Sequence, residues 1–222
     1  MEKQAINYLI DSSFVLVEKK NYIIIPVLLI SSLYCSIFIS NELLPLYNLS
    51  IMIALLIVIP IFYGQFVEIL VSGKTNDWKD VLKKYWFKFV CISFLLKMPI
   101  ITIRLMFKDI GILEEIFSLA ISLLTIYVLP VVFLQEAILP SIKLALKCLI
   151  GNAKFSAPFL IVLIAFSIFC HTITAFAHHV DFQFISYGTS IFLILVSTFV
   201  DFWIFVSATM VIIDKFALKK TV

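Results

Sequence analysis

Six long apolar stretches occupy most of this 222-residue chain, and they restrict its possible folds more than any other feature. The hydrocarbon core of a bilayer is about 30 Å thick, so a helix needs about 20 predominantly apolar residues to cross it. Hydrophobic residues make up 63% of the chain and charged residues 14%, which is typical of a polytopic membrane protein. The sequence therefore predicts an all-α bundle of six transmembrane helices in a single domain. These helices are expected at residues 21–40, 43–72, 88–107, 112–135, 156–177 and 184–213.

Lysine and arginine residues are distributed unevenly along the chain. Fourteen of the 17 lie in the N-terminus, the second and fourth connecting segments and the C-terminal tail, whereas Arg104 and Lys108 fall on the opposite side. Short cytoplasmic loops of membrane proteins collect Lys and Arg. We therefore expect a multi-pass protein of the cell membrane with both termini in the cytoplasm. The net charge of +3 is too small to indicate nucleic-acid binding.

Three amphipathic segments precede the first, third and fifth apolar stretches, at residues 4–20, 78–88 and 140–150. Each has apolar residues at helical spacing on one face and is too polar to cross a bilayer, so we expect three interfacial helices. Gly73 and Asp77 separate the second stretch from the second amphipathic helix. Gly73 suits the left-handed residue after a helix, and Asp77 suits the N-cap of the next one.

The pattern of one amphipathic helix followed by two apolar stretches occurs three times, over residues 4–72, 77–135 and 137–213. The first stretches of these units begin near 21, 88 and 155, a spacing of about 67 residues. Such hydropathy symmetry often reflects a duplicated unit in membrane proteins. The units share no residue-level identity, so coincidence is the other interpretation.

Two segments resemble a broad prokaryotic group that includes the membrane domain attached to some glycerophosphodiester phosphodiesterases and several six-span families. Residues 12–26, SSFVLVEKKNYIIIP, are similar to its opening pattern of a serine, a lysine and a proline. Residues 129–147, LPVVFLQEAILPSIKLALK, resemble its second landmark, although Leu146-Lys147-Cys148 stands where the group tends to have Arg-Ser. The resemblance implies an architecture. It implies no active site, because the catalytic residues of those phosphodiesterases lie in a separate soluble domain.

Two ionisable residues fall inside predicted spans, and such residues are costly enough to suggest a function. Lys97 is expected roughly 14 Å and Asp201 roughly 18 Å from the cytoplasmic boundary, at 1.5 Å per helical residue. Their similar depth predicts an ion pair. This pair would either fasten two helices together or form a substrate or proton site.

Gln65 and Glu68 lie closer to the cytoplasmic boundary, where Glu68 is expected to reach the interface or meet a lysine of the amphipathic helices. Glu136 is expected at a helix end, facing Lys143 or Lys147. The second amphipathic helix should carry its tryptophans at headgroup level and its lysines toward anionic lipid or a protein partner. The residues of this interfacial face are Trp78, Lys79, Lys83, Lys84, Trp86 and Lys88.

No motif in the chain indicates a particular chemistry. The four cysteines lie in different segments without a C-x-x-C spacing, and we expect no metal site, disulfide framework or cofactor. The leading hypothesis is a non-enzymatic integral membrane protein that acts in transport or as the membrane subunit of a complex. It would contact the bilayer, anionic headgroups and a cytoplasmic or membrane protein. The alternatives are a small-solute transporter or channel that uses Lys97 and Asp201, and, third, an intramembrane lipid-modifying enzyme.

Overall fold

The computed structural model describes residues 5–34, 43–106, 111–135, 137–151, 153–178 and 183–216. Within these ranges every regular element is an α-helix, which confirms the predicted all-α class. The helices are α1 (Ala5–Glu18), α2 (Asn21–Tyr34), α3 (Leu44–Ser72), α4 (Trp78–Met106), α5 (Gly111–Leu124), α6 (Val128–Leu134), α7 (Ile138–Gly151), α8 (Ala153–His178) and α9 (Gln183–Phe216).

Three described segments are long and apolar enough to cross a membrane: Leu44–Ser72, Ser156–Ile173 and Ile191–Lys215. They correspond to the predicted second, fifth and sixth spans. The segment Asn21–Ser32 of α2 is apolar but shorter, and residues 35–40 of the predicted first span lie outside the described residues. Membrane association is therefore supported by three helices, and the number of six spans is not confirmed.

The predicted third and fourth spans differ from simple crossing helices. The second amphipathic segment and the third span form one continuous helix, α4, because neither a glycine nor a helix-terminal cap interrupts residues 78–106. The fourth span is broken into α5 and α6 by a turn at residues 125–127. At this turn the Thr125 hydroxyl donates to the Ile121 carbonyl at 2.6 Å, and Val128 N–H donates to the Thr125 carbonyl at 2.8 Å.

Gly73 and Asp77 act as expected between α3 and α4. Gly73 has φ +72°, a left-handed conformation that favours glycine, and its N–H donates to the Ile69 carbonyl at the end of α3. One Asp77 side-chain oxygen accepts a hydrogen bond from Lys79 N–H at 2.9 Å. This carboxylate satisfies one of the amide groups that the first turn of a helix leaves free.

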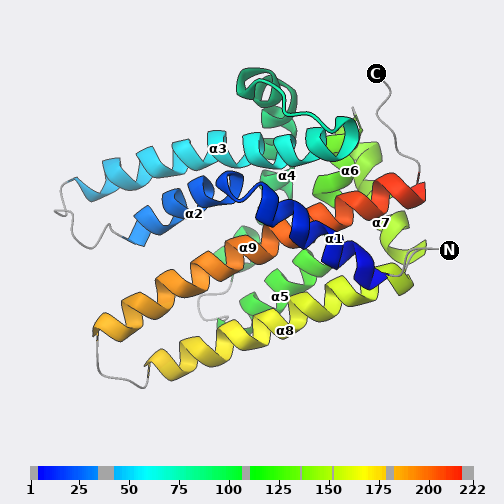
Figure 1. Ribbon diagram of the computed structural model, residues 1–222. Helices are drawn as coiled ribbons and strands as arrows, with labels where there is room; N and C mark the ends of the chain where they lie inside the picture. Colours follow the sequence, from blue (N-terminus) through cyan, green and yellow to red (C-terminus); the bar gives the residue numbers. More distant parts are fainter. Residues whose placement is uncertain are drawn as a thin grey trace.

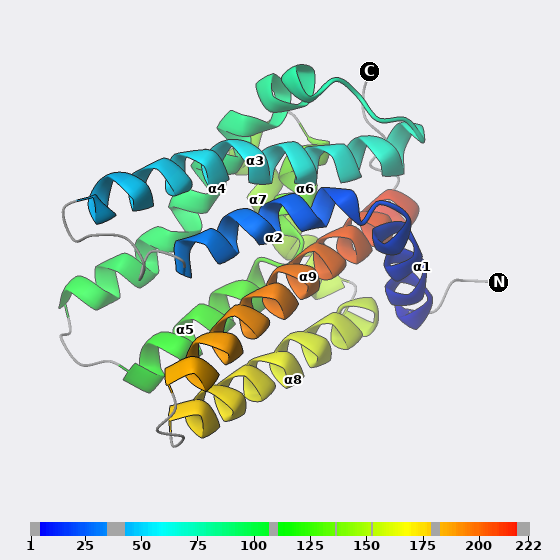
Figure 2. The ribbon, with the colours of Figure 1, turned by 60° about the vertical axis from the view of Figure 1, so that its left-hand side comes forward.

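The long helices lie alongside one another, with α9 between α2 and α8 (Figures 1 and 2). In an apolar 18-residue window of Ile191–Lys215 in α9, 47% of the residues are buried, against 11% in the corresponding windows of the other two candidate spans, so α9 is the most central of the three. The start of α1 and the end of α9 lie at the same end of the molecule (Figure 1). The best-packed part of the core is at this end, where α9 meets α1, α3 and α6.

Candidate functional site

A buried polar cluster joins the end of α3 to the start of α4, and Glu68 is at its centre. The Glu68 side chain is 2% exposed. Its Oε1 accepts hydrogen bonds from Lys84 Nζ at 2.5 Å and from the Tyr85 hydroxyl at 2.6 Å, and its Oε2 accepts from Asn76 Nδ2 at 3.0 Å. The carboxylate is thus paired with a charge and hydrogen-bonded through both oxygens, as a buried ion requires.

Gln65 lies one helical turn before Glu68 and fastens the segment between the two helices. Its side-chain Nε2 donates to the Asn76 carbonyl at 2.6 Å, and its Oε1 accepts from Asn76 N–H at 3.3 Å. Gln65 and Glu68 therefore bind the backbone and the side chain of the same residue. The turn at residues 73–77 is held against α3 by these bonds rather than by apolar packing.

Tyr85 connects this cluster to α6. Its ring stacks on Phe133 with the centroids 4.7 Å apart and an interplanar angle of 20°. The ring fits because residue 64 is glycine: a Cβ there would overlap the side chains of Tyr85 and Val81. Burial, followed by the hydrogen bond to Glu68, raises the pKa of the Tyr85 hydroxyl far above its ordinary value. Tyr85 therefore remains a neutral hydrogen-bond donor to the carboxylate.

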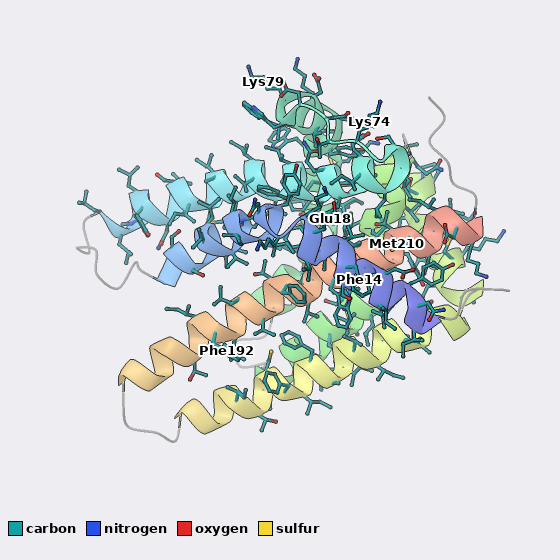
Figure 3. The ribbon with its side chains drawn as sticks, in the orientation of Figure 1. Phe14, Glu18, Lys74, Lys79, Phe192 and Met210 are labelled. Carbon is teal, nitrogen blue, oxygen red and sulfur yellow. The ribbon has the colours of Figure 1, made fainter. Side chains whose placement is uncertain are left out.

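Two of the four lysines of the predicted interfacial face are bound within the protein. Lys84 pairs with Glu68, which gives Glu68 the expected lysine partner, and Lys88 Nζ donates to the Gln135 carbonyl at the end of α6 at 2.5 Å. Lys79 and Lys83 are exposed, and Lys79 extends away from the bundle at the start of α4 (Figure 3). Lys84 and Lys88 are therefore not available to lipid or a partner in the way expected, whereas for Lys79 and Lys83 that expectation stays a prediction. Glu136 lies outside the described residues.

The inward face of α4 also differs from the predicted one. Val81, Tyr85 and Ile92 are buried against the bundle, whereas Trp78 and Trp86 are 54% and 41% exposed. Helical spacing in the sequence puts Trp78, Tyr85 and Trp86 on one apolar face of this segment. In the structure Tyr85 turns inward while the tryptophans lie outward with the exposed Lys79 and Lys83, because Tyr85 and Lys84 must both reach Glu68.

The helices α1 and α7, together with residues 78–88 of α4, each pack against the bundle with one face and leave apolar side chains outward on another. We call these three segments the collar. On α1, the outward stripe recurs at helical spacing while Leu9, Ser12 and Leu16 are buried inward. The outward apolar residues of the collar are Ile6, Ile10, Phe14 and Val17 on α1, Trp78, Trp86 and Phe87 on α4, and Leu139, Leu146 and Ile150 on α7.

The predicted ion pair between Lys97 and Asp201 is not formed. Neither residue takes part in an ion pair with another described residue, unlike Glu68 with Lys84, and both Lys97 and Asp201 are exposed. Tyr63 stacks on Phe89 of α4 and on Phe202 of α9, which places these two residues at one level. Lys97 is eight residues beyond Phe89, about 12 Å along α4, whereas Asp201 adjoins Phe202. The estimate of similar depth was wrong because it used the ends of the apolar stretches instead of the packing register.

Sequence reasoning missed Asn76 and Tyr85 as partners of Glu68. Asn76 is adjacent to a helix cap and Tyr85 belongs to an apolar face, so neither suggests a polar cluster on its own. The available signal was the small residue Gly64 next to Gln65 and Glu68, which marks a close approach of another helix. Among the described residues, no group of three or more His, Cys, Asp and Glu side chains could hold a metal ion.

Comparison with known proteins identifies no relative: no family model, no curated protein and no solved structure matches the chain. The site is therefore interpreted from its own geometry. This geometry consists of an internally bonded polar cluster at Glu68, a collar with outward apolar faces, and an isolated carboxylate within α9.

Proposed function

We propose that the chain is a non-enzymatic integral membrane protein that acts as the membrane subunit of a larger, transport-related complex. In this proposal the collar lies in the interface of the cytoplasmic leaflet. The turn at residues 73–77 and the start of α4 then face the cytoplasm, where a partner can bind. The multi-pass topology with six spans and cytoplasmic termini is part of the same proposal.

The observation that supports it is the outward face of the collar. Phe14 is 69% and Ile150 is 79% exposed, and the other outward apolar residues of the collar are exposed as well. Apolar side chains on this scale do not remain in water on a stable protein, whereas the boundary between headgroups and acyl chains accepts them. Lys79 and Lys83 stand beside Trp78 and Trp86, the combination that suits an anionic interface.

The polar cluster at Glu68 supports a structural role rather than catalysis. Both carboxylate oxygens are occupied by donors of the same chain, and the nearby Tyr85 hydroxyl is one of these donors. A general acid or base must be able to reach a proton of its substrate, and Glu68 is enclosed. We therefore infer that the cluster fixes α4, and with it the exposed part of the collar, at a defined angle to α3.

The resemblance to the membrane domain of glycerophosphodiester phosphodiesterases is consistent with this proposal, because that domain accompanies a separate functional unit. The alternative of a transporter built on a Lys97–Asp201 pair loses its geometric basis, since the two residues lie at different levels.

The collar can be tested with lipids brominated near the carbonyl end of their chains, which quench tryptophan fluorescence by contact. In full-length protein reconstituted into brominated vesicles, we expect strong quenching that falls in a Trp78→Phe, Trp86→Phe double variant. Trp203, the third tryptophan, donates its Nε1–H to the Leu9 carbonyl at 2.8 Å and is half-buried, so it supplies the remaining signal. Equal quenching of wild type and double variant would show that the collar does not enter the membrane.

The lysines provide a second measurement on the same protein. Each lysine near an anionic surface contributes about 1 kcal/mol, so the Lys79→Gln, Lys83→Gln variant should retain markedly less anionic lipid after purification into neutral detergent. Lys97→Gln is the matched control, because Lys97 is exposed on the same helix but lies outside the collar. A loss that is equal in the control would mean that net charge, and not the collar, retains the lipid.

A further inference from the structure

Asp201 lies near the middle of Ile191–Lys215, the most buried of the candidate spans. Its chain neighbours Val200 and Phe202 are buried, as are Thr198 and Phe205 one turn away on the same side of α9. The Asp201 side chain itself is exposed. A carboxylate at membrane depth is costly and is normally directed at a partner or at accessible space inside the protein. The Asp201 side chain is thus accessible to a ligand, although its neighbours on α9 are packed inside the bundle.

A tyrosine from a second helix packs beside this carboxylate. The Tyr63 ring of α3 contacts Phe202, which follows Asp201 in the chain, and Phe205, which lies one turn further on the same side of α9. The charge of the carboxylate also acts on the Tyr63 hydroxyl. The Tyr63 ring is held between Phe202 at 4.5 Å, Phe205 at 4.4 Å and Phe89 at 6.3 Å, measured between ring centroids. These rings fix the position of the hydroxyl.

Neither polar group is satisfied by the part of the chain that the structure describes. No hydrogen bond or ion pair of the described residues involves the Asp201 carboxylate or the Tyr63 hydroxyl. The Tyr63 side chain is half-buried. By contrast, both carboxylate oxygens of Glu68, which also has a neighbouring tyrosine, accept hydrogen bonds. The Asp201 carboxylate and the Tyr63 hydroxyl can therefore accept further hydrogen bonds, whereas the Glu68 carboxylate already accepts bonds from groups of the same chain.

We propose that the Asp201 carboxylate and the Tyr63 hydroxyl form a binding site for a protonated amine carried on an apolar body. The ammonium group would donate one hydrogen bond to the carboxylate and another to the phenol oxygen, which compensates the single negative charge. The membrane-embedded surface around the site suits an apolar substituent. A divalent cation fits less well, because calcium and magnesium require six or more oxygen ligands and this site presents one carboxylate.

The site goes beyond the proposed function, since it is separate from the collar and from the cluster at Glu68. Lys97 forms no ion pair with Asp201, and it lies about 12 Å along α4 from Phe89, the residue of α4 that contacts Tyr63. The Glu68–Lys84 pair does not extend to it either, because Lys84 is held by Glu68 at 2.5 Å.

The test uses full-length protein in nanodiscs of neutral lipid and titrates n-hexylammonium by calorimetry, with n-hexanol as the uncharged probe of the same length. Hexylammonium should bind in a saturable manner and hexanol at least about tenfold more weakly, because a hydrogen-bonded charge is worth that much. Asp201→Asn should weaken binding of hexylammonium about tenfold or more, and Tyr63→Phe several-fold. Asp214→Asn is the matched control, since Asp214 is an exposed carboxylate at the end of the same helix, and it should bind as wild type does.

Three outcomes would overturn the site: equal binding of hexanol and hexylammonium, an unchanged affinity in Asp201→Asn, or an unchanged affinity in Tyr63→Phe. If Asp201→Asn does not fold, Tyr63→Phe and Asp201→Glu decide the question. Tyr63→Phe retains the packed ring and removes only the hydroxyl, whereas Asp201→Glu retains the charge and should keep affinity within about tenfold. The lipid quenching of the collar is measured independently, so failure here leaves that proposal standing.

Discussion

At the residue scale, the carboxylates of Glu68 and Asp201 differ in whether the protein itself supplies partners for the negative charge. Glu68 is buried and receives three hydrogen bonds, one of them from the ammonium group of Lys84. Asp201 lies deeper in the apolar part of the chain but has a reachable side chain. Breaking a buried pair is more destabilising than the pair is stabilising, because the remaining charge is left without a partner. This difference predicts a structural phenotype for Glu68 and a binding phenotype for Asp201.

Glu68→Gln should lower the thermal stability of the purified protein. The amide can still accept from Tyr85 or Asn76, but it leaves Lys84 without its counter-charge. Lys84 is one-third exposed, so water reduces the loss to about 1–3 kcal/mol. Lys84→Met should cost a similar amount, and the double variant should cost less than the sum of the two. Lys83→Met, on the exposed side of the same helix, should behave as wild type. Strictly additive losses would show that Glu68 and Lys84 are energetically independent.

At the element scale, the amphipathic helices are fastened by different means. The start of α4 is held by the ion pair at Glu68 and by the Lys88–Gln135 bond. The first helix, α1, is held on α9 by the bond from Trp203 Nε1 to the Leu9 carbonyl and by a 2.5 Å hydrogen bond between the Ser12 and Ser207 hydroxyls. These neutral hydrogen bonds are worth about 1 kcal/mol each. The attachment of α1 is therefore expected to be weaker than that of α4.

Trp203→Phe combined with Ser207→Ala should loosen α1 without unfolding the bundle. Hydrogen exchange of residues 5–18 should become about tenfold faster or more, because removing these bonds changes the local opening free energy by about 1–2 kcal/mol. Exchange in the turn at residues 73–77 should not change, since Gln65 and Glu68 hold it separately. Trp86→Phe serves as the control, because Trp86 is exposed. A uniform increase across the protein would instead indicate global destabilisation.

At the scale of the whole molecule, the three predicted repeat units show a common packing order. The helix that opens each unit packs against the last helix of another unit: α1 on α9, α4 on α3, and α7 on α6. The last two contacts join neighbours in the chain, whereas α1 on α9 brings the two ends together. A threefold duplication would produce this cyclic arrangement, and the duplication itself stays a prediction.

Labelling from outside the cell tests the orientation of the whole molecule. In a variant without native cysteines, Lys74→Cys lies in the exposed turn between α3 and α4 and should be protected from an impermeant thiol reagent in intact cells. His179→Cys, in the predicted last external segment, should react. Permeabilised cells provide the control, in which both positions should react. Labelling at position 74 in intact cells would reverse the proposed topology.

The sequence by itself was sufficient for the helical class, for the membrane character of the three candidate spans and for the local helix ends at Gly73 and Asp77. These properties depend on hydrophobic periodicity and on short-range hydrogen bonds, both of which are visible within a few residues. The lysine partner of Glu68 was also predicted, because a buried carboxylate next to a lysine-rich helix has few other choices. The sequence did not predict which of the four lysines of residues 78–88 would be this partner.

Only the tertiary structure decided which residues meet across helices. The rotation of α4 follows from the fit of Tyr85 between Gly64 and Phe133, and the level of Asp201 follows from the stacking of Tyr63 on Phe89 and Phe202. A sequence pattern gives the faces of a helix but not its register or rotation relative to a neighbour, because these depend on side-chain shapes from distant parts of the chain. For this reason the expected partnership of Lys97 and Asp201 was wrong, while an open site at Asp201 and Tyr63 emerged from packing alone.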